Sequence, residues 1–335
     1  MKAAVFDGKN IAFKSVKDPS IRNSQVLIQV KAVGICGTDL AILSGSLPST
    51  TPIILGHEFS GEIIKIGDEA SPDWLNKRVT SEINTNRDFT CYYCKEENFT
   101  QCISRKALGI DVDGAFAEFI AVESYLLHEL PDSISYDDAT FIEPLAAAYQ
   151  VFETMPIDQN DKTVAIFGLG KLGLLITQVA LSKGLNLIVV DGSHKKLTLA
   201  KKFGAQRLIN RFGDRTIPHT IRNFTHDLGA DIVIDATGNP IAINNVLASC
   251  RTRGKVHIKS THGFDTPINL TDVVVRELTL YSSRCGPFNK AIEGLKSGEI
   301  NVGKMVSKKF ALKDINKAID YCKLDHDHIK TIINI

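Results

Sequence analysis

The chain has 335 residues, 44% of them hydrophobic, which is enough for one large domain or two domains of ordinary size. Its formal net charge of +1, with 23% charged residues, gives no indication of a polyanionic partner, so nucleic-acid binding is not expected. No apolar stretch reaches about 18 residues and no signal-peptide pattern is present, so we expect no membrane span and a cytoplasmic location.

The first part of the chain, residues 1–134, has the composition of many short strands broken by glycine, proline, asparagine and aspartate. β-Branched residues predict strands at 25–33 and 61–67. The segment 80–109 differs because it is polar, rich in asparagine and poor in apolar residues. A lobe of this composition needs something other than a hydrophobic core to hold its shape.

Three cysteines lie in that polar segment: two residues separate Cys91 from Cys94, and seven separate Cys94 from Cys102. Clustered thiolates at this spacing favour a structural zinc site. Clustered cysteines are more typical of metal thiolates in a reducing compartment than of disulfides. A redox pair at Cys91 and Cys94 is a rival interpretation, although the βαβ context of thioredoxin-type pairs is missing. A third interpretation is a metal-free lobe with three reduced thiols.

Beyond residue 135 the pattern changes to that of an α/β domain. The stretch 136–149 has a helical composition, which Pro144 is expected to interrupt. Strands and helices then alternate until about Tyr281, and this alternation predicts right-handed βαβ units in a doubly wound parallel sheet. The predicted strands are 163–167, 185–190, 230–235 and 255–258, and the predicted helices are 171–183 and 195–203.

A glycine triplet, Gly168, Gly170 and Gly173, lies between the strand 163–167 and the helix after it. The first glycine permits a tight turn, the second lets the backbone approach a pyrophosphate, and the third allows close packing of helix on strand. Free N–H groups at the start of the helix can then stabilise phosphate charge. This context predicts a dinucleotide site.

Asp191 ends the next predicted strand, where its carboxylate can accept hydrogen bonds from the adenosine ribose. The same carboxylate would repel a 2′-phosphate, so we expect NAD to be preferred over NADP. Lys195 and Lys196 lie close enough to weaken that preference. The alternative is a glycine-rich turn that binds nothing, but the strand, the helix and the acidic residue are all in place.

A second set of residues has the chemistry of a metal site. Cys36, His57, Glu58 and Glu143 offer a thiolate, an imidazole and two carboxylates, which together suit zinc. Spacing along the chain cannot show whether these four side chains converge. His57 alone would be best interpreted as a structural histidine.

The motifs that contain these residues are specific as a set. The stretches 34–39, 56–61 and 143–146, followed by the glycine triplet, closely resemble the zinc-dependent medium-chain alcohol dehydrogenases, and in particular their sorbitol, threonine and glucose dehydrogenase branches. The resemblance implies a GroES-like, mostly β catalytic domain over 1–134, completed by 286–335. It places a Rossmann domain between them, over 135–285, with the active site in the cleft.

Carried over by position, the resemblance makes Cys36 and His57 zinc ligands. Glu58 would be a ligand or a close neighbour, and Glu143 would bind zinc directly or through a water. Relatives carry four cysteines in the polar lobe, and Asp88 occupies the position of the first. A carboxylate is a harder ligand than a thiolate, so a second zinc there would be held more weakly.

The resemblance also implies roles around the first zinc. Asp39 would orient the ring of its histidine ligand, and Thr38 would hydrogen-bond the substrate hydroxyl and pass its proton outward. Many relatives complete a proton relay with a histidine at the position of Ala41. The proton must then leave through Thr38, the ribose hydroxyls and water, or through Glu143. Lys330 matches a basic residue that in relatives contacts the counterpart of Glu58 or the pyrophosphate.

The function implied is hydride transfer between NAD(P) and an alcohol, polyol or sugar hydroxyl, or the matching carbonyl, with zinc polarising the oxygen. Leu172 and Lys196 match positions that touch the cofactor. A small-molecule substrate and a homodimer or homotetramer joined edge to edge through Rossmann sheets are expected. The rivals are a zinc-free quinone or enone reductase of the same superfamily and a non-catalytic dinucleotide-binding protein.

Overall fold

The computed structural model describes residues 1–213, 216–261 and 263–335, and its chain folds into two units. The first unit comprises Met1–Glu143, Ala291–Lys296 and Val302–Ile335, and the second comprises Pro144–Lys290 and Ser297–Asn301. The helix α3 (Tyr136–Ala139) packs against strands of the first unit. No helix in the described part of the chain is both long and apolar enough to cross a bilayer.

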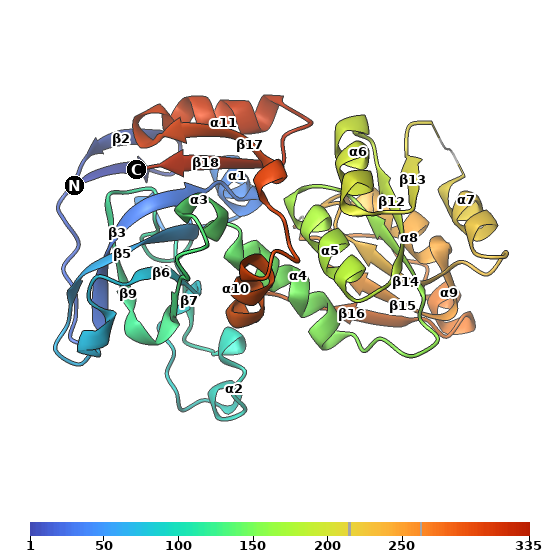
Figure 1. Ribbon diagram of the computed structural model, residues 1–335, viewed down its shortest axis with the longest axis horizontal. Helices are drawn as coiled ribbons and strands as arrows, with labels where there is room; N and C mark the ends of the chain where they lie inside the picture. The colour runs from blue at the N-terminus through green and yellow to red at the C-terminus, as the bar shows by residue number, and fades with distance from the viewer. Residues whose placement is uncertain (214–215, 262) are drawn as a thin grey trace. The chain divides into compact units, whose positions relative to one another are not determined.

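The first unit is mostly β (Figure 1). Its main sheet has seven strands: six follow the order β10-β6-β5-β3-β18-β17, and β9 also pairs with β3. Three strands form a second sheet in the order β2-β1-β4, and β7 pairs with β8. Along β3, buried residues alternate with half-buried ones, so one face of the strand meets a core of aliphatic side chains and phenylalanines.

The strands of the first unit are β1 (Lys2–Phe6), β2 (Ile11–Ser15), β3 (Gln25–Gly34), β4 (Ile53–Ile54), β5 (Glu58–Ile66), β6 (Arg78–Ser81), β7 (Asn84–Thr85), β8 (Lys106–Ala107), β9 (Phe119–Glu123), β10 (Leu127–Glu129), β17 (Val306–Ala311) and β18 (Lys330–Asn334). Its helices include α1 (Gly37–Leu43), α2 (Tyr92–Lys95) and α11 (Ile315–Leu324). The polar lobe around α2 has little regular structure.

The second unit contains a six-stranded parallel sheet in the order β13-β12-β11-β14-β15-β16 (Figure 1). The chain enters at the centre, winds outward to β13, returns beside β11 and winds outward again to β16, which is the doubly wound topology expected. The strands are β11 (Thr163–Phe167), β12 (Asn186–Asp191), β13 (Arg207–Asn210), β14 (Ala230–Asp235), β15 (Cys250–Ile258) and β16 (Thr279–Ser282). The helices are α5 (Lys171–Ser182), α6 (His194–Phe203), α7 (Ile217–Phe224), α8 (Ile243–Ser249) and α9 (Leu270–Val275).

One expectation about the helices is wrong. Pro144 does not interrupt a helix, because it lies in the first turn of α4 (Ile142–Thr154), where a backbone N–H has no helical partner to lose. The break in the predicted helix comes earlier, between α3 and α4. One further helix, α10 (Phe288–Lys296), follows the sheet of the second unit.

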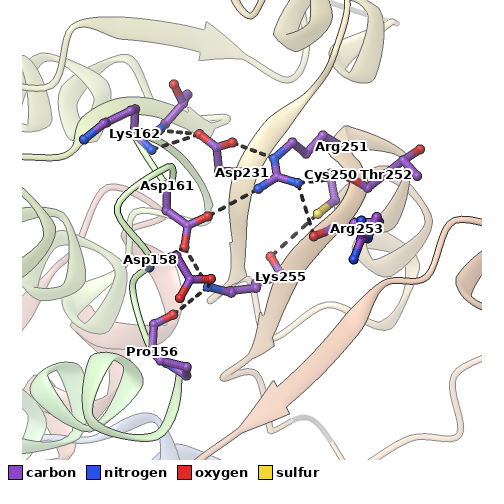
Figure 2. Close-up of polar contacts among 11 residues, drawn as sticks. Pro156, Asp158, Asp161, Lys162, Asp231, Cys250, Arg251, Thr252, Arg253 and Lys255 are labelled. Carbon is purple, nitrogen blue, oxygen red and sulfur yellow. Dashed lines mark hydrogen bonds and ion pairs between the residues drawn. The ribbon is translucent and has the colours of Figure 1, made fainter.

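Ion pairs join the amino ends of the central strands (Figure 2). Buried Lys255 donates to Asp158 and Asp161, both at 2.6 Å, and Arg251 donates to Asp231 at 2.6 Å and to Asp161 at 3.4 Å. The carboxylate of Asp231 also accepts the backbone N–H groups that begin β11. These ion pairs lie at the amino edge of the sheet, and the opposite, carboxyl edge carries the glycine triplet.

Candidate active site

The first candidate metal ligand lies where β3 runs into α1. Cys36 is the residue before the first turn of α1, and its N–H donates to Asp39 Oδ2 at 2.8 Å, which closes a capping box. The other oxygen of Asp39 accepts the N–H of Gly56 at 3.2 Å. One buried carboxylate therefore fastens the loop of Cys36 to the loop that precedes His57.

His57 is buried beside this carboxylate, just before β5 begins. Its Nδ1 lies 3.7 Å from Asp39 Oδ1 and makes no hydrogen bond with any described residue. Burial acts to lower the pKa of His57, but the negative charges of Asp39 and Cys36 outweigh it and raise that pKa to about 10. The ring therefore lies in a strongly negative potential, as is expected of a site built to receive a cation.

The structure brings three of the four predicted ligands together. One donor atom each from Cys36, His57 and Glu58 lies within 4.8 Å of the others. Zinc binds such ligands at about 2.0–2.3 Å, so a small contraction of the group would let it hold the ion. Donor set and charge both fit zinc.

Glu58 also has a cationic partner. Lys330, the first residue of β18, is fully buried and forms an ion pair with Glu58, as the resemblance implies. Its ammonium also donates to Thr140 O at 3.0 Å and lies 5.1 Å from the centre of the Phe141 ring. Gly34 makes room for this side chain, because a Cβ there would lie 1.9 Å from Lys330 Nζ.

The role of Gly34 beside Lys330 was not predicted from the sequence. A glycine at the end of a strand of β-branched residues is a signal for close approach of another group. What approaches is a lysine nearly three hundred residues further along the chain, and no local pattern identifies it.

Two other predicted residues lie nearby without joining the group of donor atoms. Glu143 is half-buried in the first turn of α4, and its charge contributes to the raised pKa of His57. Thr38 is half-buried in the first turn of α1, two residues after Cys36. Direct coordination by Glu143 and proton transfer by Thr38 stay predictions.

The polar lobe forms a second group of donor atoms. Atoms from Asp88, Cys91, Cys94 and Cys102 all lie within 4.8 Å of one another. One oxygen of Asp88 accepts the N–H groups of Thr90 and Cys91 at 2.9 and 2.8 Å, and the other lies 3.4 Å from Cys102 Sγ. The aspartate is therefore held by the backbone with one oxygen directed at the thiols.

The electrostatics of this lobe also fit a cation. The N–H groups of Cys91 and Thr90 hold the pKa of Asp88 well below its usual range, so it is a carboxylate. Desolvation, together with the neighbouring Cys102 and Cys91, raises the pKa of the Cys94 thiol to about 12. A bound cation would reverse that effect and favour thiolates.

The glycine triplet follows β11 and opens α5. Gly168 has φ +87°, in the left-handed region that favours glycine, and a Cβ on Gly173 would lie 1.8 Å from Gly168 O. A Cβ on Gly170 would meet nothing within 4 Å, which leaves open space for a ligand against the backbone. Leu172 is half-buried in the first turn of α5.

Asp191 ends β12 beside the triplet. Its Oδ2 accepts the N–H of Leu169 at 2.6 Å and its Oδ1 accepts that of Ser193 at 2.8 Å. Ser193 caps α6 by accepting the N–H of Lys196 at 3.1 Å. The predicted ribose acceptor and the predicted pyrophosphate loop thus lie together at the carboxyl edge of the sheet, where ligands of such sheets bind.

Comparison with known proteins agrees with this geometry. Residues 22–132 match the family model described as the alcohol dehydrogenase GroES-like domain, and residues 172–297 match the one described as zinc-binding dehydrogenase. D-arabitol-phosphate dehydrogenase of Enterococcus avium is 31% identical over 332 residues, covering 96% of this chain and 93% of that protein. This chain belongs to the zinc-dependent alcohol dehydrogenase family. Its members and this chain share the fold class predicted from the sequence.

One further relative and one solved structure support the same family assignment. Sorbitol dehydrogenase of Bacillus subtilis is 32% identical over 96% of this chain and 93% of that protein. The structure of a zinc-binding dehydrogenase of Sinorhizobium meliloti bound to NADP has a TM-score of 0.91 at 27% identity, covering 100% of this chain and 99% of that one. As a family member the chain is an NAD(P)-dependent oxidoreductase acting on alcohols, and neither rival function gains support.

Proposed function

We propose that this dehydrogenase oxidises a polyol or sugar-derived hydroxyl, or reduces the matching carbonyl, at a zinc site held by Cys36 and His57 with Glu143 and Glu58. The convergence of donor atoms from Cys36, His57 and Glu58 in a negative potential is the observation that carries this proposal. The names of the curated relatives, one a sorbitol and one an arabitol-phosphate dehydrogenase, support the substrate class.

Each residue has a defined task in this proposal. Bound zinc would supply Lewis acidity at the reacting oxygen. Asp39 holds the His57 ring and the Cys36 loop in register through its two oxygens. Because Ala41 cannot relay the substrate proton, that proton would leave through Thr38, the ribose hydroxyls and water, or through Glu143.

The two units would divide the work as the resemblance implies. Residues 1–134 and 286–335 would form the catalytic domain, and 135–285 would bind the dinucleotide through Gly168, Gly170, Leu172, Gly173, Asp191 and Lys196. NAD is the preferred cofactor in this proposal, since the carboxylate of Asp191 can accept hydrogen bonds from the ribose hydroxyls and would repel a 2′-phosphate.

We expect activity to be metal-dependent and selective. NAD reduction, followed at the nicotinamide absorbance, should occur with some members of a panel of polyols, phosphorylated polyols, sugars and secondary alcohols. Removing zinc with a chelator should abolish turnover, while NAD binding measured by calorimetry changes little, because the two sites use different residues. Turnover that survives complete zinc removal would favour a zinc-free reductase.

A second zinc is proposed for Asp88, Cys91, Cys94 and Cys102. Metal analysis should then find two zinc ions per chain. Asp88→Ala should lower the content toward one, because only three thiolates remain in the lobe. Asp111→Ala is the matched control: this aspartate lies just after the lobe and accepts the N–H of Ala107 within it at 2.8 Å, but it is not among the clustered donors. A content near one in the unaltered protein would refute the lobe assignment.

A second copy of the chain is the partner we propose for the free edge of the parallel sheet. β16 is the edge strand, its Leu280 is exposed, and the preceding helix α9 exposes Val274 and Val275. An unpaired strand beside apolar side chains favours pairing with another strand. Light scattering that finds a monomer at micromolar concentration would contradict this.

The seven free cysteines support the cytoplasm as the location.

A further inference from the structure

The end of β13 brings a cation to the ribose side of the candidate dinucleotide site. β13 runs parallel to β12, with Asn210 opposite Asp191, and Arg211 follows directly. The N–H of Arg211 donates to Asp191 O at 3.0 Å. The residue that receives the ribose and the first residue after β13 are therefore hydrogen-bonded neighbours.

The side chain of Arg211 crosses over Gly192, the residue after that aspartate. A Cβ on Gly192 would lie 2.9 Å from Arg211 Nε and 2.5 Å from a carbon of the Phe212 ring. A side chain at position 192 would require the arginine and the ring to shift. The arginine is thereby placed at the turn between β12 and α6, against Gly192, the residue after Asp191.

The arginine side chain has one ring contact, and the turn that carries it is held by hydrogen bonds. Its guanidinium stacks 4.0 Å from the centre of the exposed Phe212 ring. Asn210 holds the turn, donating to Gly192 O at 3.3 Å and accepting the N–H of Phe212 at 2.9 Å. Arg211 is exposed, and within residues 1–213, 216–261 and 263–335 its guanidinium forms no ion pair.

We propose that Arg211 binds the 2′-phosphate of NADP, so that the protein accepts both dinucleotides. This rests on the proposed dinucleotide site. Asp191 alone disfavours NADP, because its carboxylate repels a 2′-phosphate. Both of its oxygens accept backbone N–H groups, which offset part of that negative charge. A planar guanidinium held by stacking is well suited to bind a phosphate through paired hydrogen bonds. Asp191 sets the preference for NAD, and Arg211 sets how far NADP is tolerated.

Titration calorimetry with ADP-ribose and 2′-phospho-ADP-ribose tests the proposal without needing turnover. The unaltered protein should bind both. Arg211→Ala should weaken 2′-phospho-ADP-ribose by about tenfold or more, the effect of losing hydrogen bonds to a charged group. It should change the affinity for ADP-ribose by less than about twofold, and Arg211→Lys should fall between.

Arg207→Ala is the matched control, because Arg207 begins the same strand and stacks 5.1 Å from the centre of the Phe224 ring at the amino edge. It should alter neither affinity. Equal weakening of both ligands by Arg211→Ala, or no difference from the control, would overturn the proposal. So would an unaltered protein that binds ADP-ribose alone, which leaves the proposed function intact. Failure to bind either ligand would overturn the dinucleotide site as well.

Discussion

Serine in place of Cys36 should remove the first zinc and almost all turnover while leaving dinucleotide binding unchanged. A hydroxyl is a far weaker zinc ligand than a thiolate, so the group with His57 and Glu58 loses its soft donor. Metal polarisation of an oxygen supplies several kcal/mol of transition-state stabilisation, so kcat/KM should fall by about a thousandfold. Zinc content, steady-state kinetics and NAD calorimetry on the same preparation measure the three effects.

Cys250→Ser is the matched control for this substitution. Cys250 is buried at the start of β15, and its thiol donates to Lys255 O at 3.7 Å, a contact that a hydroxyl can also make. The control should retain zinc and turnover. A Cys36→Ser protein that keeps both its zinc content and its kcat/KM would show that Cys36 is no ligand.

Local pattern was sufficient for most of the parallel sheet. Runs of Val and Ile between polar residues predicted strands at 163–167 and 230–235, and β11 and β14 have these bounds. Buried parallel strands are apolar on both faces, so such runs identify them directly. The bounds of α5 differ from the prediction by one residue, because a glycine-rich loop marks its start.

Contacts between distant parts of the chain could not be predicted in this way. The pair of Glu58 and Lys330 joins residues 272 positions apart, and spacing carries no information on such a distance. The family resemblance suggested the contact, but it did not give its complete burial or the need for a bare Gly34 beside it. The short strand β13, which positions Arg211, has too little apolar sequence to stand out.

That buried pair leads to the second large effect: Lys330→Met should destabilise the first unit strongly. The ammonium is fully buried and Glu58 is nearly so, so removing the lysine charge leaves a carboxylate without its compensating cation. Breaking a buried pair from one side costs about 3–5 kcal/mol. Urea unfolding followed by circular dichroism, with zinc present, should show the transition of this unit at clearly lower denaturant concentration.

Two further variants separate charge from packing. Lys309→Ala removes a half-exposed ion pair with Asp137 from the neighbouring strand β17, and its cost should stay below about 1 kcal/mol. Combining Lys330→Met with Glu58→Gln removes both buried charges and should recover most of the loss, since no carboxylate is then left uncompensated. If Lys330→Met alone costs no more than Lys309→Ala, the charge of Glu58 must be neutralised by another cation. Zinc and a protonated His57 are the two cations expected beside it. If the added cost of Lys330→Met then appears only after zinc is removed by a chelator, Glu58 is a metal ligand rather than a neighbour.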